Sequence, residues 1–249
     1  MTDGSPHLLI LIRIKGSAAM EKKRTFLLLQ INDALFPIGG YSHSYGLETY
    51  IQKELVTNAV QAEEYIRKKI THNFVYNDLF YCRLAWEAAD SGNLEKLEEL
   101  EEIVEAGKVP AELRDASRKM GSRFVKTLKA CDIPYETDIF KRYTEQREGR
   151  TYSHTVAYGV FCRSTGFSLD DCLEHFLYSQ VSAMVTNCVK TIPLSQTTGQ
   201  KILVSCYEAM DKVLEQVKEL PLFLLGAGAP GFDIRCMQHE ALYSRIYMS

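Results

Sequence analysis

Residues 37–48 carry the densest group of side chains whose types could do chemistry. The run reads PIGGYSHSYGLE and places the phenol of Tyr41, the hydroxyl of Ser42 and the imidazole of His43 in succession. Its proline and first two glycines end an apolar run, because proline cannot continue a helix and glycine adopts conformations closed to other residues. A helical pattern then resumes. We therefore expect a sharply shaped loop that enters a helix, with Ser42 or Ser44 as the N-cap.

This loop has two interpretations. It is either a helix–helix turn whose polar side chains face solvent, or a recognition loop whose hydroxyl, imidazole and phenol groups contact a ligand or partner. The residue types alone leave both open.

Three carboxylates suggest an enzyme instead. Asp170, Asp171 and Glu174 have the DDxxE spacing with which helical prenyl-transferring enzymes hold magnesium diphosphate, since carboxylates four apart on one helix face can share Mg²⁺ ions. These acids directly follow Ser168, however, and negative charge in a first helical turn contributes ~0.3–1 kcal/mol by complementing the helix dipole. The sequence contains no second Asp-Asp pair of this kind, so helix capping is favoured.

Metal and nucleophile sites are equally weakly indicated. Cys172 and His175 lie three apart and could face one ion, but a closed zinc site needs about four ligands and this pair supplies only two. His43 and His239 could serve as a ligand or a base, although isolated histidines are more often structural. No nucleophile motif is present. We predict no catalytic residue and no metal site.

Two further segments are better suited to recognition than to packing. Residues 187–200 read NCVKTIPLSQTTGQ, end one long helix and open the next, and offer Lys190 and Gln196 as contact residues. A structural role for Lys190 is also open, because a cation is favourable near a helix C-terminus.

The chain end, residues 239–249, reads HEALYSRIYMS. It is rich in the tyrosine, methionine and arginine that are enriched in protein interfaces. We expect a tail that is loosely held until a partner orders it. Its candidate contact residues are Tyr243, Arg245 and Tyr247.

The elements that must position these segments are helices. Apolar residues recur three to five apart almost everywhere, and period-two alternation is absent or very short. Ser168 with Asp171 resembles a capping box. We predict an all-α, single-domain bundle of about nine or ten helices. Its later helices are expected near residues 136–147, 153–165, 169–190, 198–219 and 234–247.

Composition is consistent with that fold. The 249 residues are 46% hydrophobic and 24% charged, and the net charge of −3 gives no basic field for nucleic acid. Seven cysteines without a CxxC pair indicate a reducing compartment. The apolar run at residues 8–12 is shorter than the roughly 20 residues of a membrane span, and its positive charges follow it, unlike those of a signal peptide. We expect a cytoplasmic protein without membrane association.

We expect two regions along the chain. Residues 1–19 form a weakly ordered extension, and residues 20–249 form one all-α domain that ends in a partner-binding tail. Charge is also patterned: residues 87–105 are acid-rich and the next predicted helix is basic. Either the acid-rich and the basic regions are both solvent-exposed helix faces, or the basic helix is a docking surface for an acidic partner.

Residues 37–48, 187–200 and 239–249 together resemble the UreF family of urease accessory proteins. Tyr158-Gly159-Val160-Phe161 adds weaker similarity, and the likeness extends from about Phe26 to the C-terminus. The ending looks most like Helicobacter-type members, whereas residues 1–19 match nothing in the family.

The resemblance implies a non-enzymatic nickel-insertion chaperone. UreF-type proteins dimerise and bridge a UreD/UreH-type accessory protein and the GTPase UreG, and the assembly loads nickel into apo-urease. Nickel and GTP would be handled by the partners, so no cofactor is bound stably. By motif position, Tyr41 and Arg245 look like residues of the surface that recruits the GTPase, with a less certain role for Lys190 and Gln196.

Two rival functions remain open. A GTPase-activating or GTPase-gating regulator would use Arg245 or Lys190 to stabilise phosphate charge in trans. A helical magnesium–diphosphate enzyme would use the acids of the DDxxE segment.

Overall fold

The computed structural model describes residues 22–248, and the predicted extension over residues 1–19 lies outside this part. The chain divides into two compact units, one ending at Phe36 and one beginning at Pro37. In the first unit, residues 22–32 form a helix that ends in a turn, where the backbone N–H of Phe36 donates to the carbonyl of Asp33 (2.9 Å). The second unit contains all three segments singled out above.

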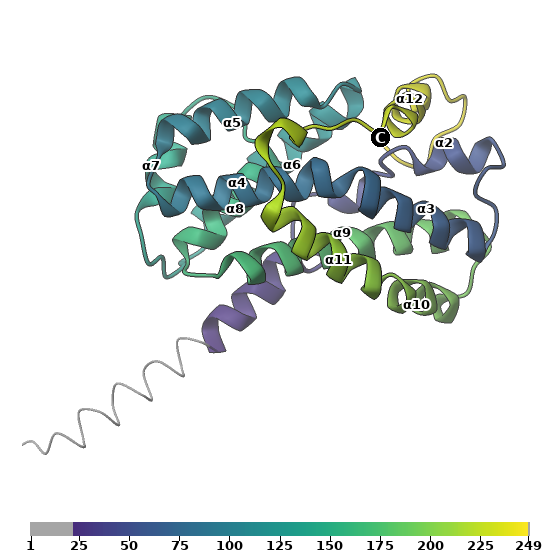
Figure 1. Ribbon diagram of the computed structural model, residues 1–249, viewed down its shortest axis with the longest axis horizontal. Coiled ribbons are helices and arrows are strands. Elements are labelled where there is room, and N and C mark those ends of the chain that lie inside the picture. The colour runs from purple at the N-terminus through teal and green to yellow at the C-terminus, as the bar shows by residue number, and fades with distance from the viewer. Residues whose placement is uncertain (1–21, 249) are drawn as a thin grey trace, which may run out of the picture. The chain divides into compact units, whose positions relative to one another are not determined.

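The second unit is built from α-helices and short 3-10 helices (Figure 1). The α-helices are α2 (Leu47–Gln52), α3 (Ala59–His72), α4 (Asp78–Asp90), α5 (Leu94–Gly107), α6 (Ala111–Lys129), α7 (Ile139–Gln146), α8 (His154–Ser164), α9 (Leu169–Thr191), α10 (Gln196–Ser205), α11 (Tyr207–Glu219) and α12 (Pro230–His239). The 3-10 helices are η1 (Gly40–Ser42), η2 (Phe74–Tyr76) and η3 (Leu222–Leu224). No strand occurs among residues 22–248, which confirms the all-α prediction.

The eleven labelled α-helices exceed the nine or ten expected because one predicted helix is two. The helix expected over 198–219 breaks at Cys206, which ends α10 and begins α11. There the Arg67 guanidinium of α3 donates to the Ser205 carbonyl, so this carbonyl is satisfied from outside the helix. The predicted capping box of α9 is confirmed, since the hydroxyl of Ser168 accepts from the N–H of Asp171 (3.0 Å).

Helices α4, α6 and α8 pack closely in the centre of the unit. Glycines permit the two closest approaches: a Cβ at Gly159 of α8 would lie 2.6 Å from the Cys82 carbonyl oxygen of α4, and one at Gly121 of α6 would lie 2.1 Å from the Tyr152 carbonyl oxygen. Such contacts exclude any side chain. An aromatic cluster fills the adjoining core, in which Phe124, Tyr158, Phe161 and Phe176 are almost fully buried.

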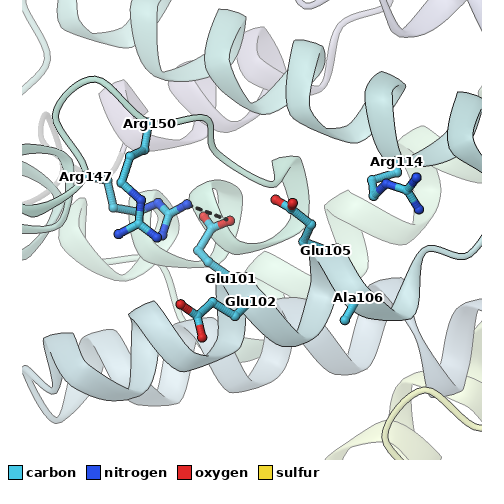
Figure 2. Close-up of a pocket in the computed structure, with 7 residues that line it drawn as sticks. All are labelled: Glu101, Glu102, Glu105, Ala106, Arg114, Arg147 and Arg150. Carbon is cyan, nitrogen blue, oxygen red and sulfur yellow. Dashed lines mark ion pairs between the residues drawn. The ribbon is translucent and has the colours of Figure 1, made fainter.

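A buried carboxylate ties α5 to α7 and α8. Glu101 accepts from the Tyr143 hydroxyl and from the backbone N–H of Ser153 (2.9 Å), and lies 3.9 Å from the Arg147 guanidinium. Burial raises the pKa of Glu101, while Arg147 and these hydrogen bonds oppose the rise. Figure 2 shows this pair at the edge of a surface groove of about 480 Å³.

Each arginine that lines this groove already has a protein partner. Arg147 and Arg150 pair with Glu98 at 2.7 and 2.5 Å, and Arg114 donates to the Lys108 carbonyl (2.9 Å). Since their donors are engaged within the protein, the groove is a poor anion site. The ion pairs and hydrogen bonds of these arginines stabilise the fold.

Replacing Glu101 tests this structural role. Glu101→Ala is expected to lower the free energy of unfolding by about 3 kcal/mol, because Arg147 and the Ser153 N–H lose a buried partner. Glu102→Ala, at the exposed neighbouring position, is expected to change it by less than about 0.5 kcal/mol. Urea unfolding measures both, and equal effects would contradict the assignment.

The core also contains a buried histidine that resists protonation. His154 packs edge-on to Phe124 with ring centroids 5.5 Å apart, and burial lowers its pKa from 6.5 to about 4. The unfolded chain therefore takes up a proton at a higher pH than the folded chain does, and stability is lost as pH falls from 6.5 towards 4.

We expect this residue to cost about 3 kcal/mol of stability over that pH interval. His154→Leu should flatten the pH dependence of urea unfolding between pH 6.5 and 4.5. Part of the slope should persist, because burial also lowers the pKa of His43 to about 4. An unchanged slope in the variant would show that His154 is not the titrating group.

Candidate functional site

The opening loop owes its shape to two glycines with left-handed backbone. Gly39 (φ 80°) precedes η1 and Gly46 (φ 84°) precedes α2. The expected N-cap at Ser42 or Ser44 is therefore wrong for α2, because the backbone at that position strongly favours glycine. The hydroxyl of Ser42 donates to the Gly39 carbonyl (2.7 Å), and a Cβ at Gly46 would lie 2.7 Å from the Cys236 thiol of α12.

Glu48, in the first turn of α2, connects this loop to the chain end. It is 4% exposed, and its Oε1 accepts from the backbone N–H of Ile246 (2.7 Å). Its Oε2 accepts from the backbone N–H of Tyr247 (3.1 Å) and lies 3.1 Å from His239 Nε2. One more backbone bond, from Met248 N–H to the Ser42 carbonyl (2.8 Å), seats the tail beside the loop.

A second carboxylate, Glu112 of α6, completes the arrangement. Its Oε2 lies 2.6 Å from His239 Nδ1, and its Oε1 accepts from the Arg245 guanidinium at 2.7 Å. The His239 ring is fully buried between two carboxylates. Carboxylates only accept hydrogen bonds. Each of the two contacts is therefore a hydrogen bond only if a proton lies on its ring nitrogen or on its carboxyl group.

The tail is thus anchored through its backbone while most of its side chains point outwards. The helix expected over 234–247 is wrong beyond His239, where α12 ends, because Glu48 captures the N–H groups that a helix would use. The expectation that the tail is loosely held until a partner orders it stays a prediction, although three of its backbone N–H groups are hydrogen-bonded in this structure. The exposed side chains of the tail include Tyr243, Arg245, Ile246 and Met248, whereas Tyr247 is buried.

The second segment reaches the same region through one residue. Asn187 of α9 is buried and donates to the His43 carbonyl (2.9 Å). Lys190 and Gln196 lie exposed in the last turn of α9 and the first turn of α10. The structure therefore places residues 187–200 beside the opening loop, and the hydrogen bond that joins them comes from Asn187.

The loop residues differ in their exposure. His43 is buried, and burial followed by the charges of Lys119 and Arg123 lowers its pKa to about 4. Ser42 is partly exposed, and the side chain of Tyr41 lies outside the part that the structure describes. Partner contact through His43 or Tyr247 stays a prediction.

A basic strip of α6 flanks the loop. Lys119, Arg123 and Lys126 are exposed at helical spacing, and Arg123 donates to the Ile38 carbonyl (3.4 Å). None of the three forms an ion pair with a described residue. The strip offers uncompensated positive charge to an acidic surface.

Sequence reasoning missed the residues that assemble this site. Glu48 and Asn187 lie inside two of the three segments but were not singled out, and Glu112 carried no signal. His239 was considered as a ligand or base, but it bridges two carboxylates. Glu48, Asn187 and His239 could have been found, since all three lie inside the segments that stood out.

The rival enzyme and metal sites are not assembled. Asp170 pairs with Lys218 (2.7 Å), Asp171 caps α9, and Cys172 is buried with its thiol 3.5 Å from that of Cys82. Among residues 22–248, no group of three or more His, Cys, Asp or Glu side chains could hold a metal ion. No helix in the same range is long and apolar enough for a membrane span.

Comparison with known proteins identifies the family. A family model described as UreF matches residues 56–207, which include the second segment. The urease accessory protein UreF of Haemophilus influenzae strain Rd is 37% identical over 225 residues, or 89% of this chain and 94% of the relative. That of Bacillus sp. strain TB-90 is 33% identical over 228 residues (91% and 99%), and that of Actinobacillus pleuropneumoniae serotype 5b is 34% identical over 226 residues (89% and 97%).

The similarity extends over nearly the whole length of these relatives, and their shared description is that of an accessory protein and not of an enzyme. The three segments that fold together around Glu48 and His239 are those that suggested the same family from sequence. This chain belongs to the UreF family of urease accessory proteins.

Proposed function

We propose that this protein is a non-enzymatic chaperone of urease maturation that bridges a UreD/UreH-type accessory protein and the GTPase UreG. The observation that carries the proposal is the seating of the tail on the opening loop by Glu48 and Ser42. This arrangement presents tyrosine, arginine, isoleucine and methionine side chains on a fixed backbone. Such residues are suited to recognition and not to proton transfer.

The two partners would use different chemistry. The tail side chains Tyr243, Ile246 and Met248 are large, apolar or aromatic, and exposed, and they suit the UreD/UreH-type protein. The loop with its basic strip, Lys119, Arg123 and Lys126, suits an acidic surface of the GTPase, with Tyr41 and Arg245 in contact. Lys190 and Gln196 would add to either interface.

Nickel and GTP are cargo and substrate of the partners in this proposal. The protein would hold no resident cofactor, act in the cytoplasm as a homodimer, and deliver the GTPase to apo-urease. A dimer would let one assembly receive two GTPase protomers.

The alternative is a GTPase-activating or GTPase-gating regulator. Arg245 would then have to leave Glu112, to which it donates at 2.7 Å, before reaching a phosphate. Exposed Lys190 would not need to leave a partner among the described residues. The engaged state of Arg245 favours the bridging role.

The first prediction concerns two exposed side chains of the tail, those of Tyr243 and Arg245. Tyr243→Ala is expected to weaken binding of the UreD/UreH-type partner by about 2 kcal/mol, and Arg245→Ala is expected to weaken recruitment of the GTPase by a similar amount, the scale of an interface hot spot. Arg245→Lys should restore binding only in part, because lysine lacks the planar guanidinium fork. Calorimetry measures the affinity, and circular dichroism checks the fold.

Tyr178→Ala is the matched control, since Tyr178 is an exposed tyrosine on α9, outside the three segments. It should bind normally. Equal losses in the control and the tail variants would remove the tail from the interface.

The second prediction separates bridging from activation. Lys119→Ala with Arg123→Ala should weaken recruitment of the GTPase about tenfold or more at low salt, and the loss should shrink at high salt. Lys129→Ala, an exposed lysine at the end of α6, should have little effect. A bridge should leave the rate of GTP hydrolysis nearly unchanged at saturation. An acceleration of 10³-fold or more would instead support an activating protein.

A further inference from the structure

The His239 ring contacts carboxyl groups of two other helices. Its Nδ1 lies 2.6 Å from Glu112 Oε2 on α6, and its Nε2 lies 3.1 Å from Glu48 Oε2 on α2. The imidazole has no exposed surface, and the Glu48 side chain is almost fully buried. Water therefore cannot replace either partner of the ring in this arrangement.

The same arrangement holds the tail. We call the tail seated when its backbone N–H groups are hydrogen-bonded to Glu48 and to the Ser42 carbonyl, as they are here for Ile246, Tyr247 and Met248. Glu48 thus takes part both in seating the tail and in holding the His239 ring, so the two events are physically connected.

The two ring contacts together require two protons. A neutral imidazole carries one ring proton, and an ionised carboxylate carries none. The seated arrangement therefore contains one proton more than a neutral histidine beside two carboxylates, whether that proton lies on the ring or on a carboxyl group. With it, the charges of His239, Glu48, Glu112 and Arg245, which donates to Glu112 Oε1 (2.7 Å), add up to zero. Without it, a buried negative charge remains.

Loss of this proton turns one of the contacts into a repulsion. A lone pair of the ring then faces a carboxylate oxygen in a buried site, where low polarity strengthens the repulsion. The ring belongs to the last residue of α12, and the tail follows it directly. Movement of the tail away from Glu48 and Glu112 gives both carboxylates access to water and removes the repulsion.

The other imidazole in this region does not supply the same response. Burial, followed by the charges of Lys119 and Arg123, lowers the pKa of His43 in the opening loop to about 4, while the charge of Glu112 opposes the change. His43 is therefore uncharged near neutral pH.

Two thiols and one phenol near the ring also keep their protons near neutral pH. Burial raises the pKa of Cys236 in α12, of Tyr247 in the tail and of Cys188 in α9. The further charges that act on Cys236, about one turn before His239, are those of Lys69 on α3, Lys108 before α6 and Asp233 on α12. Of the groups named here, the ring and its two carboxyl partners are those whose contacts need an additional proton.

We propose that seating of the tail takes up one proton, held between His239 and the carboxyl groups of Glu48 and Glu112, so that a rise in pH releases the tail. Histidine side chains change charge between about pH 5 and 8. Below that range the ring is protonated in both the seated and the released tail, and seating does not depend on pH. Above it the released tail has lost the proton, so seating takes one up from solution and weakens as the pH rises.

This coupling is a property of the free chain. Its consequence for binding rests on the proposed function: a partner that recognises the seated tail should bind more weakly as the pH rises.

Amide hydrogen exchange of the isolated full chain tests the coupling. Protection factors of the Ile246, Tyr247 and Met248 amides, normalised to the intrinsic exchange rate at each pH, are measured from about pH 5.5 to 8.5. They should fall by up to about tenfold per pH unit in the upper part of this range, the slope for one proton. A general change of stability cannot imitate this fall, because the lowered pKa values of His43 and His154 make the fold more stable as the pH rises.

Two histidine variants identify the group responsible. His239→Gln should remove the slope, because a glutamine amide does not titrate. His72→Gln is the matched control, since His72 is an exposed histidine at the end of α3, and it should keep the slope. Equal slopes in the two variants would overturn the proposal, and so would wild-type protection that does not change with pH.

A second measurement needs no variant. In wild-type protein with isotope-labelled histidine, the ring signals of His239 should shift with pH in nuclear magnetic resonance spectra, with the same midpoint as the loss of tail protection. A ring that titrates while the tail stays protected would overturn the coupling, even if His239→Gln cannot seat its tail. A UreD/UreH-type partner whose affinity ignores the tail variants would instead contradict the proposed function and leave the coupling in place.

Discussion

The candidate site depends on a carboxylate that the fold has buried. The Glu48 carboxylate can be buried only because two backbone N–H groups and one imidazole nitrogen replace its hydrogen bonds to water. An unpaired buried carboxylate would be strongly destabilising. Its three partners come from the tail and α12, which are distant in sequence. The loop, α12 and the chain end must therefore take up their positions together.

Glu112 extends this dependence to α6. Because His239 lies between the two carboxylates, the position of α12 relative to both α2 and α6 is set by one ring. Arg245 shares Glu112, so the tail is connected to the frame by a side chain as well as by its backbone. The basic strip lies on the same helix, about two to four turns further along. Charge on α6 and apolar side chains on the tail are thus parts of one supported surface.

Most of the helical frame could be predicted from the sequence because its causes are local. Apolar spacing indicated α8 and α9 almost to the residue, and Ser168 with Asp171 marked the start of α9. The break at Cys206 could not be predicted, since neither proline nor glycine marks it and the arginine that donates to the Ser205 carbonyl lies far away in sequence, on α3. The early end of α12 has the same kind of cause, a carboxylate far away in sequence.

The site was predictable in its segments but not in its chemistry. The unusual residue types of the loop and the tail drew attention to both. The residues that join them, Glu48, Glu112 and Asn187, look ordinary in a linear sequence because only their long-range hydrogen bonds distinguish them.

Glu48 accepts hydrogen bonds from the backbone N–H groups of the tail and not from its side chains. Every residue type except proline presents the same N–H group, so the anchor tolerates almost any sequence at positions 246 and 247 that suits the local packing. Exposed positions such as Tyr243 can then diverge while the tail keeps its course. Anchorage and partner choice are in this way encoded by different atoms of the same short segment. Substitutions in the exposed tail side chains can therefore change which protein is bound without changing how Glu48 holds the tail backbone. A tail exchanged between relatives should transfer its binding specificity to the recipient.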